Sequence, residues 1–127
     1  MKKFTGIALM TALAAAMAVA GDSEKPNAKT QTINGYLVDV ACARENAMHP
    51  EPGFAAKHDK GCLQMDECVQ TGYAILTEDN KIIRFDKQSN DTAKSLIAST
   101  DKKDNWKITA TGVMNGDTFS AQSLKLQ

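Results

Sequence analysis

The sequence predicts a mainly β (α+β) domain built around a five-stranded barrel. Three observations support this fold class. Short segments rich in β-branched and aromatic residues recur along the chain, two of the breaks between them carry hairpin signals, and one amphipathic helical segment separates the third strand from the fourth. Residues 41–71 contain all three cysteines and both histidines and do not alternate like a strand, so they are predicted to form an insert between strands one and two.

The N-terminal twenty residues have the pattern of a secretory signal peptide. Lys2 and Lys3 precede an uncharged apolar stretch that ends in the small-x-small sequence Ala18–Ala20. An uncleaved membrane anchor is the alternative, but the stretch is short and rich in alanine for a membrane span. We therefore expect a periplasmic or secreted protein that leaves the membrane after cleavage, with the polar residues 21–31 as a flexible leader.

The charge balance argues against a nucleic-acid partner. Removing the signal peptide takes Lys2 and Lys3 from a chain with 15 basic and 15 acidic residues, which leaves 13 against 15, a net charge of −2. Binding to a phosphate backbone needs clustered lysine and arginine. We expect instead a metal ion, a small ligand or a partner protein.

The first three strands are predicted in two groups. Thr32–Val40 is β-branched and aromatic, and Gly35 inside it predicts a bend. Gly72–Thr77 and Lys81–Asp86 flank the polar sequence "EDN" and are predicted to form a hairpin.

A helix is predicted over Asn90–Thr100. Apolar residues recur there at helical spacing, at Ala93, Leu96 and Ile97. Asn90 or Asp91 is the expected N-terminal cap, because either side chain can accept a hydrogen bond from a free amide of the first turn.

The last two strands, Asn105–Met114 and Asp117–Leu126, surround Asn115 and Gly116. Asn-Gly between alternating strands favours a type I′ turn, which needs positive φ at both positions. Five strands with a helix between the third and fourth match the order of an OB-type barrel over residues 32–127. A ferredoxin-like sandwich is the second possibility, but it needs a different number of strands.

The insert divides at its prolines. Pro50, Pro52 and Gly53 interrupt the first half, and residues 54–71 are predicted to be helical, ending at Gly72. Gly61 lowers helix stability by about 1 kcal/mol relative to alanine, so it is the expected joint if the helix is divided.

The cysteines and histidines of the insert are the candidate functional residues. Three cysteines cannot all pair within one exported chain, so one thiol is left for a metal or for other chemistry. On a continuous helix His58 and Cys62 share a face, followed by Met65. Cys68 would lie about 9 Å along the axis from Cys62, which is too far for a disulfide between them.

Two uses of these residues remain open. In the first, Cys42, His58 and Cys62 bind zinc or copper, with Cys68 or Met65 as the fourth ligand. Thiolate with imidazole suits tetrahedral zinc, and an added thioether suits copper(I). In the second, Cys42 forms a disulfide with Cys62 or Cys68, closing a loop of about 20 to 27 residues and stabilising the fold by roughly 3 kcal/mol. The stapled module would then bind a small ligand or partner protein through its barrel face.

Other functions are less favoured by the sequence. A haem held by His58 or His49 with a methionine is a weaker option, because the domain has few aromatic residues to line its pocket. No C-x-x-C motif is present, and nothing supplies an oxyanion hole for a Cys62–His58 nucleophile pair, so a binding protein rather than an enzyme is expected. Asp39 is expected to cap the turn that follows it or to orient a histidine ligand.

Four quoted stretches carry a resemblance that covers nearly all of the mature chain. They are "GYLVDVAC", then "H…GC…M…C", then "GYAILTEDNKIIRFD", then "KDNWKITATGVMNGDTFSAQSLKL". Together they are similar to a group of small exported bacterial proteins that are OB-like and carry a Cys…His…Cys…Cys series after the first strand. The resemblance implies the fold and the compartment.

Overall fold

The structure is a computed structural model that describes residues 29–127, so the predicted signal peptide and residues 21–28 of the predicted leader lie outside the described residues. The elements, in chain order, are β1 (Gln31–Asp39), α1 (Val40–Met48), α2 (Phe54–Lys57), α3 (Lys60–Gln64), α4 (Asp66–Thr71), β2 (Tyr73–Leu76), β3 (Ile82–Phe85), α5 (Lys87–Ser99), β4 (Lys107–Asn115) and β5 (Thr118–Leu126). The α+β class and the predicted order of strands and helix are confirmed.

The five strands form one closed ring of hydrogen-bonded neighbours in the order β1-β2-β3-β5-β4, with β4 paired back to β1. All neighbours are antiparallel except β3 and β5, which run parallel. Asn115 and Gly116 lie at the β4–β5 connection as predicted, but the type I′ turn expected there is wrong. Asn115 still belongs to β4 and pairs with Thr118, so the loop residues are Gly116 and Asp117, and of the expected pair only Gly116 has positive φ, at 63°. The ring brings the end of β1 next to the start of β2, where Asp39 pairs with Tyr73.

Two glycines let the strands of the ring approach closely. A Cβ on Gly112, at the bulge between β4 and β5, would collide with the carbonyl oxygen of Ser120. A Cβ on Gly35 in β1 would lie 2.6 Å from the carbonyl oxygen of Leu76. Side chains at either position would force neighbouring strands apart.

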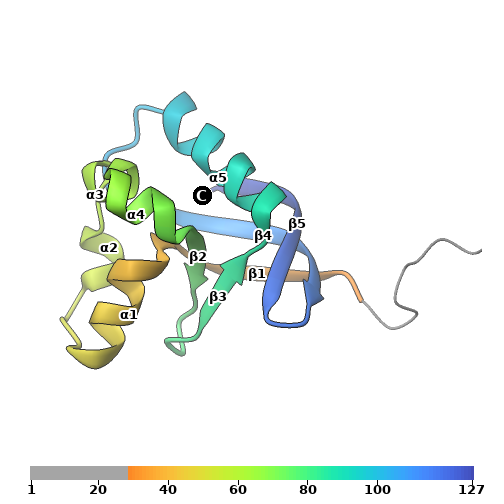
Figure 1. The fold of residues 1–127 in the computed structure, drawn as a ribbon, viewed down its shortest axis with the longest axis horizontal. Helices are drawn as coiled ribbons and strands as arrows, with labels where there is room; N and C mark the ends of the chain where they lie inside the picture. Colours follow the sequence, from red (N-terminus) through yellow and green to blue (C-terminus); the bar gives the residue numbers. More distant parts are fainter. Residues whose placement is uncertain (1–28) are drawn as a thin grey trace, which may run out of the picture.

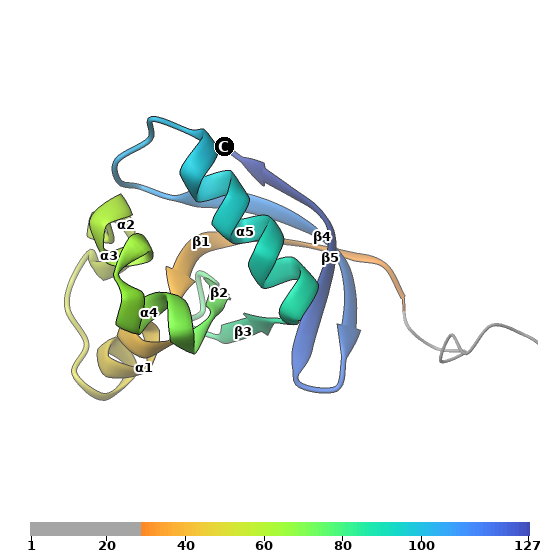
Figure 2. The ribbon, with the colours of Figure 1, turned by 45° about the horizontal axis from the view of Figure 1, so that its top comes forward.

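The core has two parts. The larger cluster fills the ring and packs against α5, and its largest fully buried members include Trp106, Phe119 and Leu37. The smaller cluster lies between the insert and the strands and comprises Val38, Val40, Ala43, Ala74 and Leu76. Figures 1 and 2 show α1 to α4 gathered at one side of the ring, with α5 passing over the strands beside them.

The predicted cap of α5 is wrong. The helix begins at Lys87, and Asp86 rather than Asn90 or Asp91 accepts the hydrogen bond of its first turn, from the amide of Ser89 at 2.9 Å. Asn90 lies inside the helix and accepts a hydrogen bond from the amide of Tyr73 at 2.7 Å. The earlier start arises because β3 ends directly before Asp86, which leaves its carboxylate over free amides.

The continuous helix predicted over residues 54–71 is also wrong. Three short helices, α2, α3 and α4, occupy the segment, and α1 is a fourth that was not predicted. His58 and Met65 have extended backbones with ψ of 118° and 133°, so the breaks fall there and not at Gly61, which lies inside α3. Asp59 restarts the helix by accepting a hydrogen bond from the amide of Cys62 at 2.8 Å.

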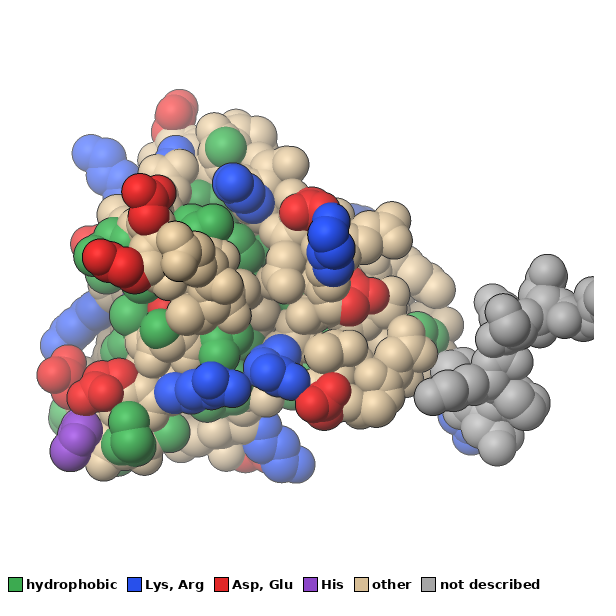
Figure 3. Space-filling view, in the orientation of Figure 1, with side chains coloured by type: hydrophobic (Ala, Val, Ile, Leu, Met, Phe, Trp, Pro, Cys, Tyr) green, Lys and Arg blue, Asp and Glu red, His purple; other side chains and the backbone are tan. Residues whose placement is uncertain are grey.

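The surface carries mixed charges. Figure 3 shows basic and acidic side chains interspersed over the face in view, without a field of one sign. Within residues 29–127, two large hydrophobic side chains are exposed, Met48 at 66% and Met65 at 48%, and both belong to the insert. Among the described residues, no helix has both the length and the apolar character that crossing a membrane requires.

Candidate metal centre

The centre of the site is Asp39, the last residue of β1. Its side chain is completely buried. One carboxylate oxygen, Oδ2, accepts a hydrogen bond from the amide of Cys42 at 2.8 Å and so caps the first turn of α1. The predicted capping role is confirmed, and the cap fixes Cys42 three residues after the carboxylate.

The second oxygen of Asp39 is held by His58. Its Oδ1 lies 2.8 Å from Nε2 of His58, which is only 4% exposed. An ionised carboxylate only accepts hydrogen bonds, so Nε2 carries the proton and donates it. The His58 ring also lies against Phe54, with 5.2 Å between the ring centroids. Hydrogen bonds to both of its oxygens therefore fix the orientation of the Asp39 carboxylate without a bound ligand.

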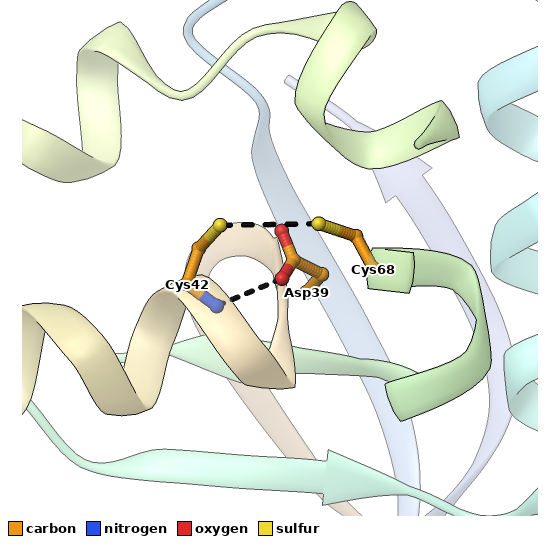
Figure 4. Close-up of side chains that lie close together, drawn as sticks. All are labelled: Asp39, Cys42 and Cys68. Carbon is orange, nitrogen blue, oxygen red and sulfur yellow. Dashed lines mark hydrogen bonds between the residues drawn. The ribbon is translucent and has the colours of Figure 1, made fainter. Parts of the chain in front are cut away.

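Two thiols complete the cluster. Sγ of Cys42 in α1 lies 4.0 Å from Sγ of Cys68 in α4, and Cys68 is only 6% exposed. A carboxylate oxygen of Asp39 and the two sulfurs all lie within 4.8 Å of one another. Figure 4 shows the two sulfurs pointing toward each other beside the Asp39 carboxylate. Residues from a strand end and from two separate helices therefore converge on one point.

Electrostatics favour a cation at this point. Burial alone would raise the pKa of Asp39, but the hydrogen bonds from His58 and from the Cys42 amide outweigh burial and hold it below its usual value. Burial, followed by the Asp39 charge, raises the pKa of Cys42 to about 12. Burial and then Asp39 also raise the pKa of Cys68. A cation among the three groups would remove the cost of ionising the thiols next to a carboxylate.

Tyr73 lies beside the cluster from β2. Its hydroxyl donates a hydrogen bond to the carbonyl oxygen of Leu63 at 2.6 Å, which ties β2 to α3. Burial, followed by the charges of Asp39 and Cys68, raises the pKa of Tyr73. Its phenol therefore stays neutral and supports the insert as a hydrogen-bond donor.

The predicted ligands are only partly brought together. Cys42 and Cys68 lie in the cluster, and His58 reaches it through Asp39. Cys62 lies outside the group of atoms within 4.8 Å. The predicted shared face of His58 and Cys62 does not exist, because α2 ends at His58 and a new helix begins after Asp59.

The remaining predicted residues behave as surface residues. His49 ends α1 with its side chain 77% exposed, 3.9 Å from a carboxylate oxygen of Glu45. Met48 and Met65 are also exposed. Sequence reasoning missed Asp39 as a metal-ligand candidate, although the spacing Asp-x-x-Cys directly after a strand is the signal that a carboxylate and a thiol share the first turn of a helix.

Cys42 also borders a small cavity that opens to the surface. The cavity has a volume of about 170 Å³ and is lined by Cys42, Glu45, Asn46, His49, Glu51 and Phe54. The amide of Glu51 donates to the side-chain oxygen of Asn46 at 3.0 Å, which holds the loop after α1 against that helix. Two carboxylates and no lysine or arginine line the cavity, so its charge suits the approach of a cation.

Comparison of the chain with models of known protein families, with curated proteins and with solved structures found no match. The resemblance to small exported OB-like proteins therefore stays a prediction. All three cysteines are free thiols in the structure, and a disulfide from Cys42 also stays a prediction. Of its two predicted partners, Cys68 is the one in contact with Cys42.

Proposed function

We propose that this protein is an exported metal-binding protein, periplasmic or secreted, whose OB-type barrel carries a site for zinc or copper. The observation that carries the proposal is the convergence of Asp39, Cys42 and Cys68, whose potential ligand atoms lie within 4.8 Å of one another. The closed strand order and the helix between β3 and β4 support the OB-type assignment.

The donor set favours zinc over copper(I). Zinc accepts thiolate sulfur and carboxylate oxygen in the same tetrahedral site, whereas copper(I) prefers soft sulfur ligands. Asp39 supplies a hard oxygen within 4.8 Å of the two sulfurs. Three protein ligands leave a fourth position for water or for a donor from outside.

His58 has the role of a positioning residue in this proposal. A histidine that donates to a metal-binding carboxylate fixes the direction of the carboxylate lone pairs. The 2.8 Å hydrogen bond to Oδ1 of Asp39 supports this role. The competing ligand set, Cys42, His58, Cys62 and Cys68, would require His58 to turn away from Asp39 and the thiol of Cys62 to join the group of atoms within 4.8 Å.

Equilibrium zinc titration of the reduced protein tests the proposal. The wild type should bind one ion. Asp39→Asn, which keeps a cap oxygen for α1, should lose stoichiometric binding, as should Cys42→Ser and Cys68→Ser. His58→Ala should weaken binding by about 10–100-fold, the usual effect of losing a residue that orients a ligand.

Two variants serve as matched controls for these changes. His49→Ala removes an exposed imidazole near the cavity, and Cys62→Ser removes the thiol outside the cluster, so both should bind zinc like the wild type. Loss of binding in Cys62→Ser would favour the competing four-residue set. A reduced, folded wild type that binds neither zinc nor copper(I) would refute the metal-binding function.

A further inference from the structure

The two thiols of the candidate site lie in contact with each other as well as with Asp39. The 4.0 Å between Sγ of Cys42 and Sγ of Cys68 joins residues 26 positions apart in the sequence. A disulfide needs the sulfurs about 2.05 Å apart, so an approach of roughly 2 Å, within the reach of side-chain rotation, would connect them. The same atoms thus have two mutually exclusive uses.

We infer that Cys42 and Cys68 are a reversible oxidation site, and that their disulfide excludes the metal ion. This inference rests on the proposed function, because it concerns the regulation of the same site. Oxidation removes two of the three ligands and leaves Asp39 alone, and a single carboxylate does not hold zinc in a protein. Metal binding in turn occupies both sulfurs and protects them from oxidation.

The exposure of the two cysteines determines which of them reacts first with an external disulfide. Cys42 lines the 170 Å³ cavity, whereas Cys68 is only 6% exposed and does not border the cavity. An external disulfide, written RS–SR, therefore reaches Cys42 first. Sulfur of Cys42 attacks one sulfur of the external disulfide, a Cys42–SR bond forms, and one RS⁻ leaves.

Cys68 then resolves the mixed disulfide. Its sulfur attacks Sγ of Cys42, the Cys42–Cys68 bond forms, and the second RS⁻ leaves. The two cysteines are oxidised by two electrons, the external disulfide is reduced to two thiols, and the two cysteine protons end on these thiols. When a zinc ion is bound, both cysteines are thiolates and carry no protons. Their oxidation then releases the zinc ion together with two RS⁻ thiolates.

The experiment uses the full mature chain, zinc, and oxidised glutathione as the external disulfide. Reduced protein is oxidised, free thiols are alkylated, and the peptides are mapped by mass spectrometry. We expect a Cys42–Cys68 bridge with Cys62 alkylated, a fall in zinc affinity of at least 100-fold, and recovery of binding after reduction. Saturation with zinc should slow bridge formation at least tenfold.

Two variants separate oxidation from metal binding. Asp39→Asn should still form the Cys42–Cys68 bridge but should gain no protection from zinc. Cys62→Ser should match the wild type in both bridge formation and loss of affinity. Cys68→Ser should stop at the mixed disulfide on Cys42, with a mass increase of one glutathione.

The outcomes distinguish the inference from the proposed function. If reduced protein binds zinc but the oxidised protein keeps its affinity, or if the bridge joins Cys62 instead, the oxidation site is wrong and the metal site stands. If the reduced wild type binds no zinc, the proposed metal-binding function is refuted. The inference that the disulfide excludes a metal ion is then refuted as well, whichever bridge forms.

Discussion

Asp39 shows how one residue links fold and site. The same carboxylate ends β1, caps α1 through the Cys42 amide and accepts a hydrogen bond from His58. The cap was predictable because a carboxylate after a strand and before a helical turn is a common arrangement. The contact with His58 was not, since it depends on how an insert of short helices folds back over the strand end.

The thiols give the site a steep pH dependence. Burial and the Asp39 charge raise the pKa of Cys42 to about 12 and also raise that of Cys68, so both thiols are protonated at neutral pH before an ion binds. Each zinc bound should therefore release about two protons, and apparent affinity should rise about 100-fold per pH unit between pH 6 and 8. Zinc titrations in several buffers measure both quantities, and release of fewer than one proton would contradict thiolate ligation.

Tyr73 offers a second test at the residue scale. Tyr73→Phe leaves the buried carbonyl oxygen of Leu63 without its 2.6 Å hydrogen bond, so the free energy of unfolding should fall by about 1–3 kcal/mol. Tyr36→Phe is the matched control, because no hydroxyl hydrogen bond of Tyr36 is found among the described residues, and it should change stability little. Urea unfolding of both variants measures the difference, and equal effects would contradict a structural role for the Tyr73 hydroxyl.

At the scale of elements, strands were more predictable than the insert. The strands follow from local patterns: β-branched residues in Ile82–Phe85 or an Asn-Gly turn determine a hairpin without distant contacts. The insert depends on competition between helical spacing and side-chain caps. The apolar spacing of residues 54–71 favours one helix, but the Asp59 side chain captures the Cys62 amide and restarts the helix, which turns His58 inward.

The N-terminus of α5 gives the prediction at this scale. Asp86→Ala removes the acceptor for the Ser89 amide and should lower the free energy of unfolding by about 1 kcal/mol. Asp91→Ala is the control, because Asp91 has only an exposed ion pair with Lys87 at 3.6 Å, and its effect should be close to zero. Thermal or urea unfolding distinguishes the two, and a larger loss in Asp91→Ala would contradict the assigned cap.

The same cap has a defined pH dependence. Burial raises the pKa of Asp86, but hydrogen bonds from Ser89 outweigh burial and lower it below the usual 3.8. Because the pKa of Asp86 is lower in the folded state than in the unfolded state, the ionised cap stabilises the protein at pH values above the unfolded-state pKa. This contribution is lost as the pH falls through the folded-state pKa. The stability difference between wild type and Asp86→Ala should therefore be present at pH 6 and decline below about pH 4. A difference that stays constant down to pH 2 would contradict an ionised cap.

At the scale of the whole molecule, the ring of strands determines where the site lies. β1 ends where β2 begins, so the insert between them must leave and return at the same point, which brings α1 and α4 together. The location of the candidate residues in this connection was predictable from the order of elements. Their pairing was not, because Cys42 and Cys68 meet only after the predicted helix divides at Met65.

This arrangement predicts that metal binding stabilises the entire domain. An ion held by Asp39, Cys42 and Cys68 would join the end of β1 to α1 and α4, and unfolding would separate all three. Zinc at 100 times its Kd should add about 2.7 kcal/mol to the free energy of unfolding, which corresponds to roughly 10–20 °C in Tm for a domain of this size. Calorimetry of reduced protein with and without zinc measures the shift, and a chelator should reverse it. Asp39→Asn should show no shift while His49→Ala should match the wild type. Equal stabilisation of wild type and Asp39→Asn would mean that zinc binds elsewhere, since the cluster cannot hold the ion when the central carboxylate is replaced by a neutral amide.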